Sequence, residues 1–196
     1  MAGFLALITL IIWPVVPLFW IPVHGLSRFI KKLGLLTYII PLVLWPPLAY
    51  LIYTQRDFLL HYKTELPLFI NVIGIVFLIA GTLLHLWTGK LLGLWGLIGL
   101  PEISSKAKGR LVTDGAFFIV RHPTYLAHTV MFSGVFLITG AMAVGIITLL
   151  DFILINAVII PLEEKELSAR FGEEYKEYKK KVPRYFPMPS RGKKEK

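Results

Sequence analysis

The sequence predicts an all-α integral membrane protein: a bundle of five transmembrane helices with an amphipathic helix at a cytoplasmic C-terminal end. The first observation is composition, since 56% of the 196 residues are hydrophobic and the mean hydropathy is +0.68, above the range of ordinary soluble domains. The second is that the net charge of +9 lies in a few loops and the tail, which is typical of membrane topology. No folded basic domain is present, so we expect no nucleic-acid partner. There is no cysteine, which excludes disulfides and cysteine nucleophiles, and we expect no metal site.

Three charge-free stretches in the first half are long enough to cross a bilayer, which takes about 20 apolar residues. We expect the first three spans to be Phe4–Pro22, Leu33–Thr54 and Leu66–Gly89. Prolines inside the first two predict kinks, which neighbouring helices in a bundle tolerate. Leu91–Pro101 is apolar and rich in glycine but too short to cross. It is therefore interfacial, re-entrant or an extension of the third helix.

Residues 124–162 are long enough for two more spans, joined by a tight turn near Gly140 and Gly145. With five spans, the segments on one side contain 3, 5 and 11 Lys and Arg residues, against 0, 2 and 0 on the other, which together are the 21 of the sequence. Because basic residues favour the cytoplasmic side, this bias predicts a cytoplasmic C-terminus and a multi-pass protein of the cell membrane.

The chain becomes polar after Pro161, and its remaining apolar residues recur near helical spacing. These residues are Leu162, Leu167, Phe171, Tyr175 and Tyr178. We expect one or two amphipathic helices on the cytoplasmic membrane face, ending before Pro183. Residues 188–196 are polar and basic and are predicted to be disordered.

Between the third and fourth predicted spans, the stretch GRLVTDGAFFIVRHPTY places Arg121, His122 and Tyr125 within five residues at the start of an apolar segment. Pro123 disfavours helical geometry at His122 and itself suits the first turn of a helix. We therefore expect a loop that holds Arg121 and His122 at the water–lipid boundary, with Tyr125 one turn inside. The alternative for the same residues is an interfacial anchor.

This stretch and the tail together resemble a known family. The pair LVTDGxxxxxRHPxYL and EExxLxxxFGxxYxxYxxxVPRxxP, separated by two short spans, resembles the isoprenylcysteine carboxyl methyltransferases and the wider group of small membrane methyltransferases that includes the phospholipid methyltransferases. The resemblance covers about residues 85–187. It implies one domain over 1–196, with three spans in 1–88 and a cofactor-binding loop, two spans and a helical tail in 89–187. It also implies S-adenosylmethionine as methyl donor and a lipid-soluble methyl acceptor.

The resemblance further implies a site on the cytoplasmic side, under the central loop and tail. Leu111 and Val112 would hold the cofactor through backbone groups, and Glu164, with Glu163 beside it, would close the site. The cofactor-binding positions it assigns are Leu111, Val112, Phe117, His122, Pro123, Thr124, Tyr125, Glu163 and Glu164. The candidate catalytic residues are Arg121, His122 and Glu164.

The chemistry of methyl transfer agrees with these residue types. A cationic methyl donor favours carboxylates and aromatic faces as neighbours, and its own carboxylate favours Arg121 or a protonated His122. His122 can also act as a general base toward an amine or thiol acceptor. The simpler interpretation of Glu163 and Glu164 is favourable charge at the start of a helix.

Two positions depart from the pattern of the family. Phe117 stands where a tyrosine is common, so a hydroxyl is lost. Ile159 and Ile160 stand where prenylcysteine-acting members have an arginine, and no Lys or Arg lies between Asp151 and Glu164. The second departure predicts an acceptor without a free carboxylate at its reacting end, such as a phospholipid amine, over an isoprenylcysteine-like substrate.

Polar residues inside the apolar segments are functional candidates because charge is costly in a bilayer. Asp151 is either catalytic, protonated, or paired with Asn156, His85 or His128. His128 either shares a cavity with Tyr125 or packs against lipid. The tryptophans, Trp13 and Trp20 among them, are predicted to be interface anchors.

Two other functions compete with methyl transfer. An NADPH-dependent membrane reductase of the sterol-reductase type also carries an Arg-His-Pro-x-Tyr-like element, and a non-enzymatic membrane scaffold is the third class. The Glu-Glu and Phe-Gly-x-x-Tyr pattern of the tail favours the methyltransferase. The expected partners are membrane lipids and the lipid-soluble acceptor, and the sequence implies no protein partner.

Overall fold

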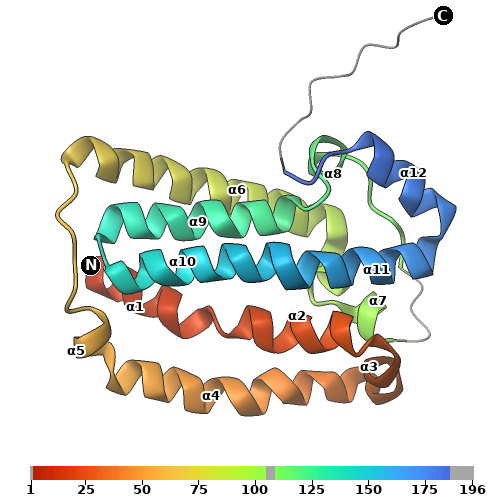
Figure 1. Ribbon diagram of the computed structural model, residues 1–196, viewed down its shortest axis with the longest axis horizontal. Helices are drawn as coiled ribbons and strands as arrows, with labels where there is room; N and C mark the ends of the chain where they lie inside the picture. Colours follow the sequence, from red (N-terminus) through yellow and green to blue (C-terminus); the bar gives the residue numbers. More distant parts are fainter. Residues whose placement is uncertain (1, 105–108, 186–196) are drawn as a thin grey trace, which may run out of the picture.

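The protein is a bundle of long helices lying side by side, with shorter helices gathered at one end (Figure 1). The computed structural model describes residues 2–104 and 109–185, and within them there is no β-strand, only an isolated bridge between Lys63 and Ala141. The all-helical prediction is therefore confirmed for this part of the chain. The prediction for residues 188–196 lies outside the described residues.

The first part of the chain forms two neighbouring rows of helices at one side of the bundle (Figure 1). Its helices are α1 (Ala2–Ile12), α2 (Val15–Gly25), α3 (Ser27–Leu33), the 3-10 helix η1 (Gly34–Tyr38), α4 (Ile39–Thr54) and α5 (Arg56–Leu59). A break at Trp13 and Pro14 separates α1 from α2, as the proline content predicted. No residue of α4 is buried within the protein, which fits a helix whose surface faces lipid.

The third long helix, α6 (Leu68–Leu97), continues well past its predicted end. Its backbone leaves helical geometry only at Gly93, which has φ 68° and ψ 170° and so requires a glycine. After α6 the short α7 (Leu100–Ile103) turns the chain back. The stretch Leu91–Pro101 therefore extends the third helix across a kink, one of the three interpretations that the sequence left open.

The second part of the chain carries the central loop and the tail. Its helices are α8 (Ala116–Ile119), α9 (Pro123–Thr139), α10 (Met142–Leu154), the π-helical turn η2 (Ile155–Ile159), α11 (Ile160–Phe171) and α12 (Glu173–Lys181). From α10 to α11 the chain forms one continuous helix of 30 residues, with η2 in the middle. The predicted turn near Gly140 is confirmed: Gly140 has φ 63°, and its carbonyl accepts a hydrogen bond of 2.9 Å from the Thr64 amide.

Small residues bring α6 and α9 into close contact. A Cβ atom added at Gly134 would lie 2.6 Å from the Leu78 amide nitrogen, and one at Gly74 would lie 2.9 Å from the Gly134 carbonyl oxygen. Helices in lipid associate through such close backbone packing, because no hydrophobic force drives apolar surfaces together there. These two glycines therefore fix the position of α9, whose first residues carry the central motif.

Within the described residues, four helical segments are long and apolar enough to cross a membrane: 2–25, 27–54, 68–103 and 142–171. The fourth predicted span, the first of the two expected in residues 124–162, corresponds to α9, which is apolar but has 17 residues. The chain is thus an integral membrane protein with four candidate spans by length and composition.

A buried carboxylate links three of these helices. Asp151 on α10 lies 3.2 Å from His128 Nδ1 on α9, and its other oxygen accepts a 2.9 Å hydrogen bond from the Trp13 indole at the α1–α2 break. Among the partners considered from the sequence, His128 is the one found. Trp13 has a partner inside the bundle, which its interpretation as an interface anchor did not anticipate.

Candidate active site

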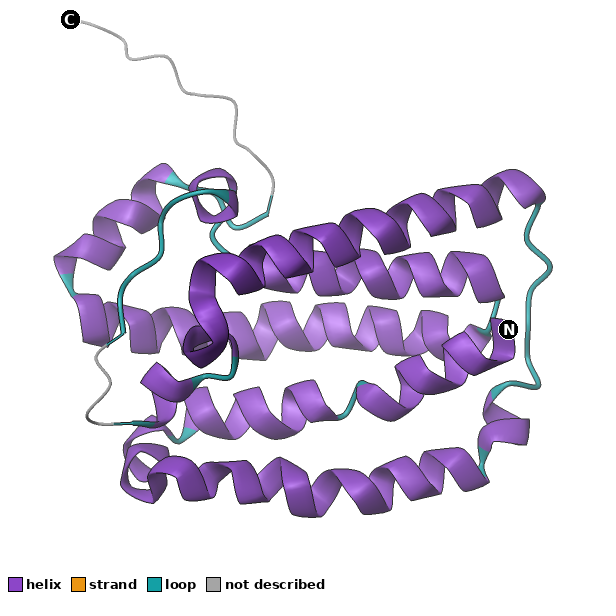
Figure 2. Cartoon of the chain, turned by 180° about the vertical axis from the view of Figure 1, so that it is seen from behind, coloured by secondary structure: helices purple, strands orange, loops and turns teal. Residues whose placement is uncertain are grey.

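The central loop, α11 and α12 meet at one end of the bundle. Figure 2 shows the loop, in teal, at the end where the C-terminal helices lie. His122 has φ −123° and ψ 57°, outside helical geometry, and Pro123 begins α9, as the residue before a proline predicts. The loop is held to the C-terminal segment, because the Arg121 amide donates to the Pro183 carbonyl at 2.8 Å and the Tyr178 hydroxyl donates to the Phe117 carbonyl at 2.6 Å.

Glu164 is buried at the centre of a cluster of basic groups. Its carboxylate lies 3.0 Å from Arg121 Nη2, 2.6 Å from Lys179 Nζ and 3.2 Å from His122 Nε2. Arg121 also donates to the carbonyls of Lys179 and Val182, so one guanidinium ties the start of α11 to the end of α12. Breaking such a buried network would leave several charges without a partner.

His122 is 4% exposed and lies between two carboxylates. Its Nε2 atom faces Glu164 at 3.2 Å, and its Nδ1 atom lies 3.4 Å from Glu163 Oε2, an ion-pair distance. Burial disfavours a charge on the ring, but the hydrogen bonds and negative charges of Glu163 and Glu164 outweigh it, so the pKa of His122 lies above its usual 6.5. The geometry therefore favours an imidazolium that donates a hydrogen bond to Glu164 and forms an ion pair with Glu163.

Two adjoining cavities open beside this cluster. The larger is about 280 Å³ and the smaller about 110 Å³. The residues that line both are Leu92, Gly96, Glu102, Phe117, Arg121 and Glu163. Because they share walls, the two form one site with two adjoining parts.

The structure distributes the sequence-predicted residues unevenly over this site. Leu111 and Val112 line the larger cavity, and His122, Thr124 and Tyr125 line the smaller one. Phe117, Arg121 and Glu163 line both, whereas Glu164 and Pro123 line neither. Consecutive residues of a helix point about 100° apart, and here Glu163 faces the cavities while Glu164 is turned toward Arg121, Lys179 and His122.

Several polar groups in the walls lack partners among the described residues. Glu102 Oε2 and Glu163 Oε2 are buried without a hydrogen bond, and so are Nε and Nη1 of Arg170 and the Tyr175 hydroxyl. Burial raises the pKa of Tyr175, which keeps its hydroxyl neutral and able to donate. Since buried polar groups are nearly always satisfied, these walls fit a ligand that carries both positive and negative groups.

Several residues that line the site were not predicted as site residues. Among them are Trp20, Glu102, Arg170, Tyr175 and Tyr178. The two tyrosines lie on the apolar stripe of the tail, so their spacing gave a signal of burial but not of function. Glu102 follows an apolar run directly after Pro101, and a carboxylate in that place was the available clue. No local pattern connects Trp20, on α2, to the site.

A model of the phospholipid methyltransferase family matches residues 69–174, more than half of the chain. The chain belongs to this family. The matched stretch begins in α6 and ends in α12, so it includes His122, Glu163 and Glu164. Helices α1 to α5 precede it, and from them the candidate active site receives Trp20.

Three curated proteins illustrate the likeness. The chain is 29% identical over 112 residues to the cobalt-zinc-cadmium resistance protein CzcN of Cupriavidus metallidurans, covering 52% of this chain and 51% of that protein. It is 32% identical over 85 residues to the nickel-cobalt-cadmium resistance protein NccN of Alcaligenes xylosoxydans xylosoxydans, covering 43% and 39%. It is 33% identical over 78 residues to the protein-S-isoprenylcysteine O-methyltransferase of Schizosaccharomyces pombe, covering 40% and 33%.

The chain thus spans about half or less of the length of these relatives. No solved structure matches it.

Proposed function

We propose that this member of the phospholipid methyltransferase family transfers a methyl group from S-adenosylmethionine to a lipid-soluble acceptor within the membrane. The observation that carries the proposal is the pair of joined cavities, into which buried carboxylate, guanidinium and aromatic groups face. The family match argues against the NADPH-dependent reductase. Two relatives are named for metal resistance, but in residues 2–104 and 109–185 no group of three or more His, Asp or Glu side chains is arranged to hold a metal ion.

The residues present fit the cofactor. S-adenosylmethionine, when bound, supplies a methyl group on a positively charged sulfur. Glu102 and Glu163 would provide carboxylates for its positive groups, and Phe117 and Tyr125 would provide aromatic surface. Arg170, with two buried donors that lack partners in the described structure, would hold its carboxylate.

Arg121 was expected to bind that carboxylate, but its guanidinium is engaged by Glu164 and by two carbonyls of the C-terminal segment. We therefore assign it a positioning role. Glu164 lines neither cavity and acts through Arg121 and His122, which do.

His122 contributes electrostatics and position. With carboxylates at both ring nitrogens, its charged form holds Glu163 at the wall of the smaller cavity. Methyl transfer needs in-line approach, so fixing one wall of the cavity favours reaction through orientation and preorganised charge. A general base would instead need one ring nitrogen free for the acceptor.

The acceptor enters a region without a cation. Ile159 and Ile160 are fully buried and pack with Ile155 and Tyr125, so the place of the family's arginine is apolar. Burying a neutral polar group without a hydrogen-bond partner costs about 2–7 kcal/mol, and burying an unpaired carboxylate there would cost more. We therefore propose an acceptor without a free carboxylate at its reacting end, such as a phospholipid amine or a small apolar amine or thiol.

The topology belongs to the same proposal. With α9 as a fifth span, the candidate active site, the amphipathic tail and the C-terminus all face the cytoplasm, as the distribution of basic residues predicts. A C-terminal reporter active only on the outer side of the membrane would overturn this arrangement.

The activity is tested with detergent-solubilised protein and labelled methyl donor. A phosphatidylethanolamine and a prenylcysteine analogue are offered separately, and the extracted lipids are analysed by mass spectrometry. Label on the amine supports the proposal in full. Methyl-ester formation on the prenylcysteine, with none on the amine, would overturn the acceptor class while leaving methyl transfer intact, and label on neither would contradict both.

A further inference from the structure

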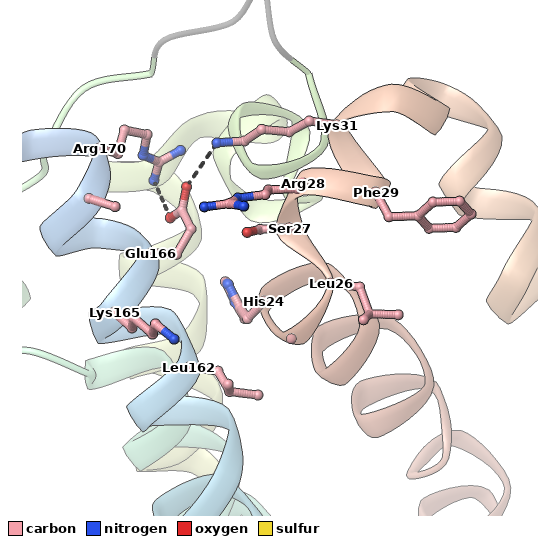
Figure 3. Close-up of a pocket in the computed structure, with 12 residues that line it drawn as sticks. His24, Leu26, Ser27, Arg28, Phe29, Lys31, Leu162, Lys165, Glu166 and Arg170 are labelled. Carbon is pink, nitrogen blue, oxygen red and sulfur yellow. Dashed lines mark hydrogen bonds and ion pairs between the residues drawn. The ribbon is translucent and has the colours of Figure 1, made fainter.

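A separate cavity of about 630 Å³ lies on the other side of α11 (Figure 3). We call it the basic cavity. Its walls come from the end of α2, from α3 and from α11. Leu162, Lys165 and Glu166 face it, whereas Glu163 and Leu167 of the same helix face the candidate active site. The helical period separates the two sets of side chains.

The charge of the basic cavity is strongly positive. Four cationic side chains line it: Arg28, Lys31, Lys165 and Arg170. Glu166 is the one carboxylate in the lining, which leaves an excess of three positive charges with histidine neutral. Lys31 and Arg170 share Glu166, at 3.3 Å and 3.6 Å. Arg28 and Lys165 have no ion pair within the described residues and lie exposed at the mouth.

A buried histidine lies deeper in the same cavity. His24 is 5% exposed, and neither of its ring nitrogens has a hydrogen-bond partner in the described part of the chain. Its ring stacks on Trp20, with centroids 5.2 Å apart and planes 9° apart, so its orientation is fixed. Figure 3 shows His24 reaching into the space between Arg28, Lys165 and Glu166. A buried ring without partners points to a ligand that supplies them.

The surroundings of the cavity are those of a membrane surface. Gly25 ends the first candidate span and Ser27 begins the second, so the opening lies where two spans meet water. Leu26 and Phe29, at its edge, are exposed apolar side chains. Basic pockets between helices at such a level suit the headgroups of anionic lipids.

We propose that the basic cavity binds the phosphate group of an anionic membrane lipid through Arg28, Lys165 and His24. Arg28, Lys165 and His24 line neither cavity of the candidate active site, so the two sites are distinct although both include Arg170 in their walls. The proposal concerns lipid binding and does not depend on whether a methyl group is transferred.

The test measures lipid binding by the purified full chain in nanodiscs and by native mass spectrometry. Phosphatidylglycerol is the probe and phosphatidylcholine the comparison. We expect phosphatidylglycerol to bind preferentially and to raise the melting temperature. Arg28→Gln and Lys165→Gln should each weaken its binding about fivefold, the effect of one basic residue near an anionic membrane surface. Both residues are exposed, so the variants should fold.

Lys176→Gln is the matched control, because Lys176 is exposed on α12 and pairs with Glu173 away from the cavity. Inorganic phosphate distinguishes the sources of the ligand: competition would mean that the phosphate group alone binds, and lack of competition that the lipid chains contribute. Equal binding of both lipids, or equal weakening in Lys176→Gln and Lys165→Gln, would overturn the proposal.

Discussion

The two faces of α11 carry opposite chemistry. One face turns Glu163, Leu167 and Phe171 toward cavities lined by carboxylates and aromatic rings, in which one oxygen each of Glu102 and Glu163 has no hydrogen bond. The other turns Leu162 and Lys165 toward a cavity with an excess of positive charge. A single helix can therefore serve a cationic methyl donor on one side and an anionic headgroup on the other, because its period sorts neighbouring residues to different faces.

Arg170 lies at the boundary between these two faces of α11. Arg170 lines both the larger cavity of the site and the basic cavity, and it pairs with Glu102 at 2.9 Å and with Glu166 at 3.6 Å. The candidate active site and the basic cavity therefore share one residue, Arg170. Variants on either side show whether the two sites act independently.

The largest effect is expected from His122→Ala. It removes the group that holds Glu163 at the cavity wall, so methyl transfer should fall about 10²–10³-fold, as when a preorganised electrostatic group is lost elsewhere. Binding of phosphatidylglycerol should persist, since His122 does not line the basic cavity. His61→Ala, at an exposed histidine outside the site, is the control. Transfer equal to that of the control would contradict the role of His122.

Glu164→Gln tests the network behind the first face. The change leaves Arg121, Lys179 and His122 without their shared carboxylate, and the loss of a buried ion-pair partner typically costs about 3–5 kcal/mol. Thermal unfolding in detergent measures this, with Glu177→Gln on the exposed side of α12 as a control expected to change little. Equal melting temperatures for the two variants would show that the network does not stabilise the fold.

Arg170→Gln tests the boundary between the faces. We expect a loss of about 2 kcal/mol in stability, from hydrogen bonds to charged groups, and smaller thermal shifts with both S-adenosylhomocysteine and phosphatidylglycerol. Lys165 lines the basic cavity but not the candidate active site. Lys165→Gln should therefore reduce the thermal shift with phosphatidylglycerol and leave the shift with S-adenosylhomocysteine unchanged. A change in just one of the two shifts in Arg170→Gln would mean that the residue serves a single site.

The smallest effect is a dependence of stability on pH. The pKa of His122 is raised in the folded protein, so its stabilising contribution is fully present below pH 6.5 and is lost as the pH rises through the folded-state pKa. As the pH rises through this pKa, both the melting temperature and the rate of methyl transfer should fall. In His122→Ala the melting temperature should no longer depend on pH in this range. Transfer that instead increases with pH would indicate that His122 acts as a general base.

Local sequence rules predicted many residues of the site, but not which of them face the cavities. The Arg-His-Pro geometry at residues 121–123 follows from proline sterics alone, and the tail signature pointed to the glutamate pair. The sequence could not say which of Glu163 and Glu164 faces the cavity, because the rotation of α11 depends on packing across the whole bundle. The same holds for Trp20, which reaches the site only through contacts between helices distant in sequence.

For the fold too, the sequence predicted the individual helices better than the contacts between them. Hydropathy located the long apolar helices, but the extension of α6 past Gly93 depends on where a glycine can leave helical geometry, and three interpretations were open. Gly74 and Gly134 set the contact of α6 with α9. A glycine in a membrane segment is common, so its packing role becomes visible only when its neighbour is known.

Binding of S-adenosylhomocysteine, the product of the proposed reaction, tests the central claim most directly. The purified protein should show a rise in melting temperature with S-adenosylhomocysteine and none with NADPH. Glu163→Gln, which removes charge from the shared cavity wall, should reduce that rise, while Lys176→Gln on the exposed face of α12 should not. A rise with NADPH and none with S-adenosylhomocysteine, or a response unchanged by Glu163→Gln, would contradict the assignment of the methyl-donor site.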